Sequence, residues 1–142
     1  MLCDMKLTVE GAHLPGKTPI GNRRIIRVTG GKLRGEQLNA DVIPGGDDWI
    51  TVREDGTIIQ DVRILLQTND DALIMMTYRG IRTGTPDVLK RLDNNEDVDP
   101  NEYYFRTSET ASPAYDWLNR RIFVSRGVRL PGKVIYSIYT IE

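Results

Sequence analysis

The sequence predicts an all-β protein that folds as a single antiparallel, lipocalin-like β-barrel with two short helical segments. Apolar and polar residues alternate with a period of two along most of the chain, and β-branched and aromatic residues are frequent. Turn signals separate the alternating stretches at fairly regular spacing. Many short strands with little helix indicate a sandwich or a closed barrel, and we expect a barrel of roughly eight to ten strands.

Strand candidates and turn signals follow one another along the chain. The dipeptide of Asp55 and Gly56 favours a tight hairpin, and the stretches "TND" before Asp71 and "LPG" before Lys133 also fit turns. Consecutive strands should therefore pair mostly antiparallel. The candidates are residues 5–10, 23–29, 36–43, 48–53, 58–67, 72–79, 103–107, 120–127 and 133–141.

Two short stretches have the signature of helices instead. Each begins with a hydroxyl residue followed by a proline, a pair that suits the N-cap and the first helical position. The stretches are "TPDVLKRL" from Thr85 and "SPAYDWLN" from Ser112. Neither is long enough to carry the fold, so both should accompany the barrel.

Length and composition indicate one domain over residues 1–142. The chain has 19 basic and 20 acidic side chains, a balance that gives no reason to expect a nucleic acid partner. No basic and apolar leader opens the chain, and no stretch approaches the ~18 apolar residues of a membrane span, so we expect no membrane partner. The single cysteine, Cys3, suits a reducing compartment, and the expected location is the cytoplasm.

Several longer motifs resemble the DUF3237 family of proteins, also known as UPF0311. They are "GNRRIIRVTGGKLRGEQLNADVIPGGDDW", an "EDG" hairpin, "QDVRILLQTNDDALI", "YRGIRTG", "VDPNEYYFRT" and "SPAYDWLNRRIFVSRG". The resemblance runs in order from about Gly21 to the C-terminus. It implies a small antiparallel β-barrel that encloses a pocket, and it implies little about chemistry because the family has no assigned function.

The strand candidate 58–67 raises the question of which face is the interior. Asp61 and Arg63 lie two residues apart and share one face, whereas Val62 and Ile64 lie on the other. One hypothesis is a solvent-exposed pair that contributes roughly 0 to 1 kcal/mol. The alternative is a pair inside the barrel, where Arg63 must lie within reach of Asp61 or Asp48 because an unpaired buried guanidinium is too costly.

The resemblance favours a functional site, because it places these residues among the polar positions that recur in the family. An Arg fork that faces a carboxylate can hold an enolate, carboxylate or carbonyl oxygen while the acid moves a proton. The candidate catalytic residues are Asp48, Asp61, Arg63 and Arg106, and the candidate ligand-binding residues are Trp49, Tyr104, Trp117 and Asn119. The expected pocket lies inside the barrel, lined by Asp48, Trp49, Arg63, Arg106 and Asn119.

Other signals are weak. His13 is the only histidine and precedes the stretch of resemblance, so a catalytic triad is not predicted. The run "DNNEDVDP" lacks the glycine and glutamate of a calcium loop, and "VTGGKLRG" lacks dinucleotide-site spacing. We therefore predict no metal site and no cofactor. The aromatic candidates could also be core or rim packing.

Two functional hypotheses remain open. The first is a cofactor-independent isomerase, cyclase or lyase that acts with Asp and Arg side chains on a small, largely apolar metabolite. The second is a non-catalytic, lipocalin-like protein in which the same groups orient a ligand. Both predict a small-molecule partner, and the sequence leaves a homo-oligomer open.

Overall fold

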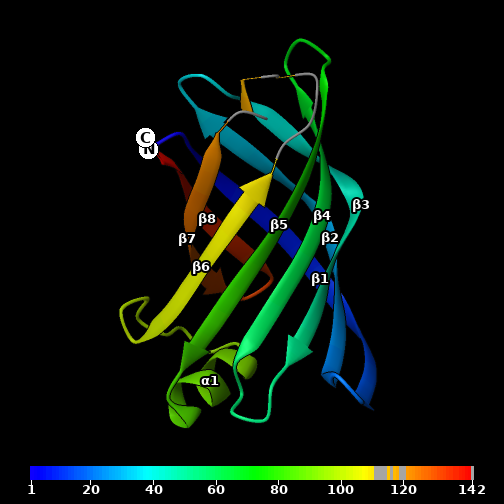
Figure 1. The fold of residues 1–142 in the computed structure, drawn as a ribbon, viewed down its shortest axis with the longest axis vertical. Helices are drawn as coiled ribbons and strands as arrows, with labels where there is room; N and C mark the ends of the chain where they lie inside the picture. Colours follow the sequence, from blue (N-terminus) through cyan, green and yellow to red (C-terminus); the bar gives the residue numbers. More distant parts are fainter. Residues whose placement is uncertain (111–114, 116, 119–120, 142) are drawn as a thin grey trace.

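Eight antiparallel strands form a closed barrel in which each strand pairs with the next and β8 pairs with β1 (Figure 1). The computed structural model describes residues 1–110, 115, 117–118 and 121–141. The all-β barrel prediction is therefore confirmed. The strands are β1 (Cys3–Thr18), β2 (Gly21–Gly35), β3 (Ala40–Val52), β4 (Ile58–Thr68), β5 (Leu73–Gly84), β6 (Tyr103–Thr110), β7 (Ile122–Leu130) and β8 (Lys133–Ile141).

Pairing between the first and last strands closes the barrel. Cys3 lies opposite Gly35 of β2 on one side and opposite Ile138 of β8 on the other. The two ends of the chain consequently lie next to each other (Figure 1). Where β1 pairs with β8, both edges of β1 are paired and offer no free edge to another chain, whereas β1 from Glu10 to Thr18 pairs with β2 alone.

Strand β3 replaces two of the predicted strands. Ile43 lies opposite Leu65 and Asp47 lies opposite Arg63, so three residues of β3 face a single residue of β4 between these pairs. Such a bulge bends the strand without ending it. The prediction of separate strands at 36–43 and 48–53 is wrong, because the "PGG" turn signal forms this bulge.

The inward-facing residues fill most of the barrel. Even-numbered residues of β4 from Ile58 to Thr68 are buried, and odd-numbered residues are partly or fully exposed. An eight-stranded barrel has an interior just wide enough for its side chains, which explains why the apolar set points inward. Met5, Leu33, Leu66, Ile74 and Phe105 are among the most deeply buried side chains.

Helix α1 (Pro86–Asp93) covers the end of the barrel where β5 finishes (Figure 1). The Thr85 side chain accepts a hydrogen bond from the Val88 amide, as expected of an N-cap, and Leu92 is buried against the barrel. The first helical segment is thus confirmed. The second, from Ser112, falls largely outside the described residues.

The predicted tight turns are present. Gly56 has a φ of 83° between β3 and β4, and Gly132 has a φ of 65° between β7 and β8, a backbone region that favours glycine. Within the described chain, no helix has the length and apolar character needed to cross a membrane.

Candidate functional site

A cavity of about 170 Å³ lies inside the barrel at the end covered by α1. Leu92 of α1 contributes to its lining, as do the apolar side chains of Leu7, Val28, Ile58 and Val62. Polar and charged side chains share this wall: Arg24, Asp48, Gln60, Arg82, Asp93, Asn95, Arg129 and the two tyrosines Tyr78 and Tyr136. The cavity therefore combines an apolar wall with a compact polar cluster.

Asp48 is the buried carboxyl group of this cluster. It lies on the inner face of β3, two residues before Ile50, and its exposed fraction is only 7%. Its Oδ2 accepts a hydrogen bond from Gln60 Nε2 at 3.1 Å, and its Oδ1 accepts one from the Asp61 backbone amide at 3.2 Å. Strand β4 thus supplies both donors, which fix the orientation of the carboxyl group.

Burial raises the pKa of Asp48 from its usual 3.8 to about 7. Loss of hydration is the largest cause, because a charged carboxylate is poorly stabilised away from water. The bonds from the Asp61 amide and from Gln60 oppose the rise, and the positive charge of Arg82 opposes it further. Asp48 can therefore both take up and release a proton near neutral pH.

Gln60 connects Asp48 to a layer of aromatic rings. Its Nε2 lies 3.5 Å from the Tyr136 hydroxyl. The Tyr136 ring packs edge-on against Tyr78 and Phe105, at centroid distances of 5.4 and 5.5 Å. Burial raises the pKa of the Tyr136 hydroxyl, so this hydroxyl stays neutral and can donate or accept a hydrogen bond.

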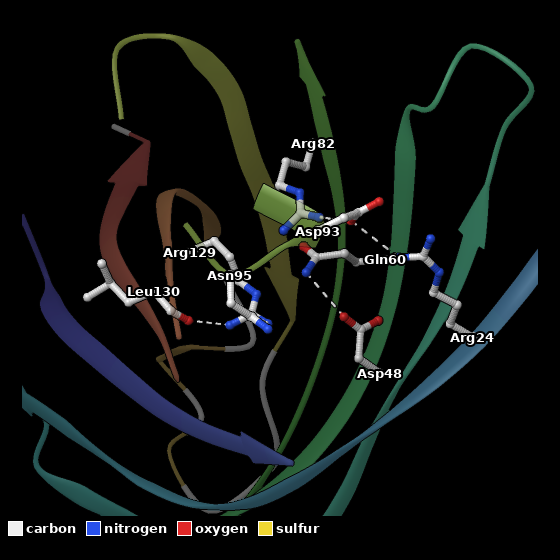
Figure 2. A network of polar contacts seen from close by, with 8 residues as sticks. All are labelled: Arg24, Asp48, Gln60, Arg82, Asp93, Asn95, Arg129 and Leu130. Atoms are coloured by element: carbon white, nitrogen blue, oxygen red, sulfur yellow. Dashed lines mark hydrogen bonds and ion pairs between the residues drawn. The ribbon is translucent and has the colours of Figure 1, made fainter. Parts of the chain in front are cut away.

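Two arginines meet Asp93 at the C-terminal end of α1. Arg24 Nη1 lies 3.4 Å from Asp93 Oδ1, and Arg82 Nη2 lies 3.8 Å from the same oxygen. An acidic residue at a helix C-terminus is unfavourable next to the negative end of the dipole, so these cations compensate it. Figure 2 shows Arg82 and Gln60 on neighbouring strands, with Asp93 between Arg82 and Arg24.

Arg129 of β7 enters the cluster from the opposite wall (Figure 2). Its Nη1 donates to the Leu130 carbonyl, and its Nη2 lies 3.4 Å from Asn95 Oδ1. Burial lowers the pKa of both Arg129 and Arg82, and the charge of Arg129 lowers that of Arg82 further. Two guanidinium groups thus repel each other across the cavity.

Two buried polar atoms of the cavity wall have no hydrogen-bond partner among the described residues: Arg82 Nε and Gln60 Oε1. The exposed fractions of these residues are 8% and 6%. A buried polar group without a partner costs about 1–3 kcal/mol, so native proteins rarely leave one unused. Arg82 Nε is a donor and Gln60 Oε1 is an acceptor, and both atoms are covered by the surrounding protein.

The expectation that Trp49 and Arg63 line the interior is wrong. Trp49 is 50% exposed, and Arg63 is exposed on the outer face of β4. Together with Arg23, Asp47 and Asp61 they border a hollow on the outer surface. Strand alternation is the reason, because Asp48 and Val62 occupy the inner face and their neighbours must point outward.

Arg63 also lacks the expected carboxylate partner. Across the described part of the chain, no ion pair joins Arg63 to Asp61 or Asp48. Of Asp61, only the backbone amide reaches the cluster, through its bond to Asp48. The solvated-face hypothesis therefore describes Asp61 and Arg63.

Arg106 and Tyr104 lie on the outer face of β6, so the expectation that Arg106 lines the interior is wrong too. The Arg106 guanidinium lies 4.9 Å from the centre of the Tyr104 ring, and its Nη1 donates to the Phe105 carbonyl. Trp117 packs against the core cluster as a partly buried side chain, and Asn119 falls outside the described residues. A ligand-binding role for Trp117 and Asn119 stays a prediction.

Sequence reasoning missed Gln60, Arg82 and Arg129. Gln60 shares a strand face with Val62, Ile64 and Leu66, so a polar residue in an apolar register was the available signal. Arg82 likewise shares the face of Ile74 and Tyr78 on β5. Around Arg129, apolar and polar residues do not alternate along the sequence of β7 as they do in β4. The position of Arg129 at the cavity is therefore seen only in the closed barrel.

The described residues contain no group of three or more His, Cys, Asp or Glu side chains arranged to hold a metal ion. The cavity's carboxyl groups, Asp48 and Asp93, are instead each next to a cationic or amide donor. The chemistry available here is that of two carboxyl groups, three guanidinium groups, two side-chain amides and two tyrosine hydroxyls.

Comparison with known proteins identifies the family. The family model "Protein of unknown function (DUF3237)" matches residues 1–141. This chain belongs to the DUF3237 family. The match extends the resemblance seen in the sequence, which began at about Gly21, to nearly the whole chain.

Relatives of this DUF3237 protein match it over most of their length, and solved structures among them share its fold. A UPF0311 protein of Clostridium acetobutylicum is 39% identical over 140 residues, which cover 96% of this chain and 89% of that protein. A protein of unknown function from Rhodopseudomonas palustris superposes with a TM-score of 0.93 at 28% identity, covering 99% of this chain and 94% of its own. A β-barrel-like protein from Acinetobacter baumannii superposes with a TM-score of 0.85 at 37% identity, covering 99% of this chain and 93% of its own.

A more distant structural neighbour is described as an enzyme. It comes from Penicillium herquei and superposes with a TM-score of 0.66 at 23% identity, covering 97% of this chain and 91% of its own. At this identity the likeness concerns the fold alone.

Proposed function

We propose that this protein is an acid/base enzyme that moves a proton on a small, largely apolar metabolite inside the barrel. Asp48 is the group that carries the proton, and the reaction class is an isomerisation, cyclisation or elimination. The single observation that supports this best is the buried Asp48, with a pKa of about 7, held by Gln60 and the Asp61 amide beside an apolar cavity wall.

The geometry suits proton transfer next to a carbonyl group. The ionised Asp48 carboxylate would take a proton from the carbon beside the carbonyl, and the electron pair of that C–H bond would form the enolate. Arg82 would stabilise the enolate oxygen, since a guanidinium in a water-poor site stabilises developing negative charge. Asp48 would then return the proton to another carbon, so that it ends the cycle ionised as it began.

The polar cluster of the cavity favours an enzyme over a non-catalytic ligand carrier. A wide apolar cup with one anchoring charge would suit a carrier, whereas this cavity has an acid, an amide and several cations close together. The same fold carries a protein described as an enzyme in Penicillium herquei, so the barrel is compatible with catalysis.

The test compares Asp48→Asn with the wild type in a metabolite extract made up in D2O. Asparagine keeps the size of the side chain and one acceptor but cannot carry the proton. Mass spectrometry should show a compound that the wild type labels with deuterium or converts, and that Asp48→Asn leaves unchanged.

Asp47→Asn is the matched control, because Asp47 is the next residue on β3 and lines the outer hollow instead of the cavity. It should label the same compound as the wild type. Equal labelling by Asp48→Asn would refute the proposal. If no compound changes and the purified protein still retains a small molecule, the non-catalytic binding hypothesis is correct.

A further inference from the structure

The cavity holds an excess of positive charge. Three guanidinium groups, from Arg24, Arg82 and Arg129, line it against the carboxyl groups of Asp48 and Asp93. Asp93 forms ion pairs with both Arg24 and Arg82. Asp48 accepts hydrogen bonds from the Gln60 side chain and the Asp61 backbone amide, and not from an arginine. An anion inside the cavity would therefore be attracted.

Of the three arginines that line the cavity, Arg82 has the weakest set of hydrogen-bond and ion-pair partners. It is 8% exposed, its Nη2 reaches Asp93 only at 3.8 Å, and its Nε has no partner among the described residues. Arg129 by contrast donates to the Leu130 carbonyl and to Asn95. A buried guanidinium with an unused donor is a costly feature unless a ligand completes it.

The size of the cavity limits what can enter. An engineered cavity of ~150 Å³ in another protein holds one benzene ring, and the present cavity measures about 170 Å³. Apolar side chains such as Val28, Ile58 and Val62 form part of the wall. The space and its lining therefore suit one ring or an apolar group of equal size.

We propose that the cavity binds a compact organic anion of about single-ring size, with its charged oxygens toward the guanidinium groups of Arg82 and Arg129. The apolar part of the ligand packs against the aliphatic wall. This inference rests on the proposed function in taking the same cavity as the substrate site, but it requires no catalysis.

The test measures binding of benzoate by isothermal titration calorimetry at constant pH and ionic strength. Benzyl alcohol, a neutral compound of the same size, and inorganic phosphate, an anion without a ring, are the comparison probes. Benzoate should bind once per chain, and both comparison probes should bind at least tenfold more weakly. Phosphate binding as strong as that of benzoate would overturn the organic class of the ligand.

Two pairs of variants locate the site. Arg82→Gln and Arg129→Gln should each weaken benzoate binding at least tenfold. Arg79→Gln on β5 and Arg126→Gln on β7 remove the same charge from the outer faces of the same strands and should stay within twofold of the wild type. If Arg82→Gln does not fold, two variants of Arg129 test the location of the site. Arg129→Lys keeps the positive charge and should retain benzoate binding, whereas Arg129→Gln should lose it.

The inference is wrong if benzoate shows no saturable binding, or if the cavity variants bind it as well as the outer-face controls do. Its failure is distinguishable from that of the proposed function. Asp48→Asn removes a negative charge from the cavity and should bind benzoate at least as tightly as the wild type. Benzoate binding by a wild-type protein that labels and converts no compound would refute the catalytic proposal alone. Turnover that depends on Asp48 without benzoate binding refutes only the anionic class of the substrate.

Discussion

Asp48 links the chemistry of the cavity to the stability of the barrel. Its folded-state pKa of about 7 lies above its usual 3.8, so the folded protein holds this proton more tightly than the unfolded chain does. The contribution of Asp48 to the free energy of unfolding is therefore largest below about pH 4, falls as the pH rises toward 7, and is constant above. Three pKa units correspond to on the order of 4 kcal/mol.

Asp48→Asn should remove this pH dependence. At pH 8 the variant should be more stable than the wild type by on the order of 4 kcal/mol, and the difference should vanish near pH 4. The groups that act on this carboxyl group are Arg82, Gln60 and Asp61, and they are unchanged in the variant. Urea unfolding at several pH values measures the difference, which Asp47→Asn should not show.

Arg63 should contribute little to stability, because it is exposed and has no ion-pair partner among the described residues. Arg63→Met should change the free energy of unfolding by about 0.5 kcal/mol or less. Loss of a buried ion pair would instead cost roughly 3 to 5 kcal/mol. A denaturant melt that showed a loss of that size would mean that Arg63 turns inward.

The sequence revealed part of the site because strand alternation depends on local residues. Asp48 was recognised, and the set Val62, Ile64 and Leu66 correctly separated from Asp61 and Arg63. The alternation alone did not show which of the two faces of β4 points into the barrel. An eight-stranded barrel has its core inside, so the apolar set defines the interior. Arg129 needed the closed structure, since it comes near Arg82 only where β5 and β7, with β6 between them, curve around the cavity.

At the scale of elements, α1 depends on its first turn. Thr85 accepts a hydrogen bond from the Val88 amide, and Leu92 at the other end of the helix lines the cavity. Thr85→Ala should lower the free energy of unfolding by about 1 kcal/mol, because an amide of the first turn loses its acceptor. Lys90→Ala on the exposed side of α1 is the control and should be close to neutral in the same urea melts. Equal effects of the two would mean that the cap does not stabilise the helix.

Most strands could be predicted because their hydrophobic period and turn residues agree. The Asp55–Gly56 hairpin and the turn before Lys133 are examples, with glycines of positive φ at both places. Strand β3 shows the limit of this reasoning. The run from Pro44 to Gly46 has the composition of a turn, and only the pairing of Asp47 with Arg63 on the neighbouring strand shows that the chain continues as a bulge.

At the scale of the whole molecule, closure makes the strands share one core. Residues from β1 to β8 belong to a single cluster of buried side chains, and β1 pairs with β8 over residues Cys3 to Thr8. A domain of fewer than ~150 residues with one such core usually unfolds in a single cooperative step. The prediction of one domain over residues 1–142 can be tested on this basis.

Trp117→Phe leaves Trp49 of β3 as the sole tryptophan, and Trp49→Phe leaves Trp117, which packs against the core cluster. In urea, the fluorescence of each variant should change at the same midpoint as its own far-UV circular dichroism, because no strand can leave the closed sheet without breaking two ladders of hydrogen bonds. Each substitution can itself shift the urea midpoint, so fluorescence and circular dichroism are compared within each protein. A fluorescence transition that precedes the loss of β-structure would show that part of the barrel opens separately.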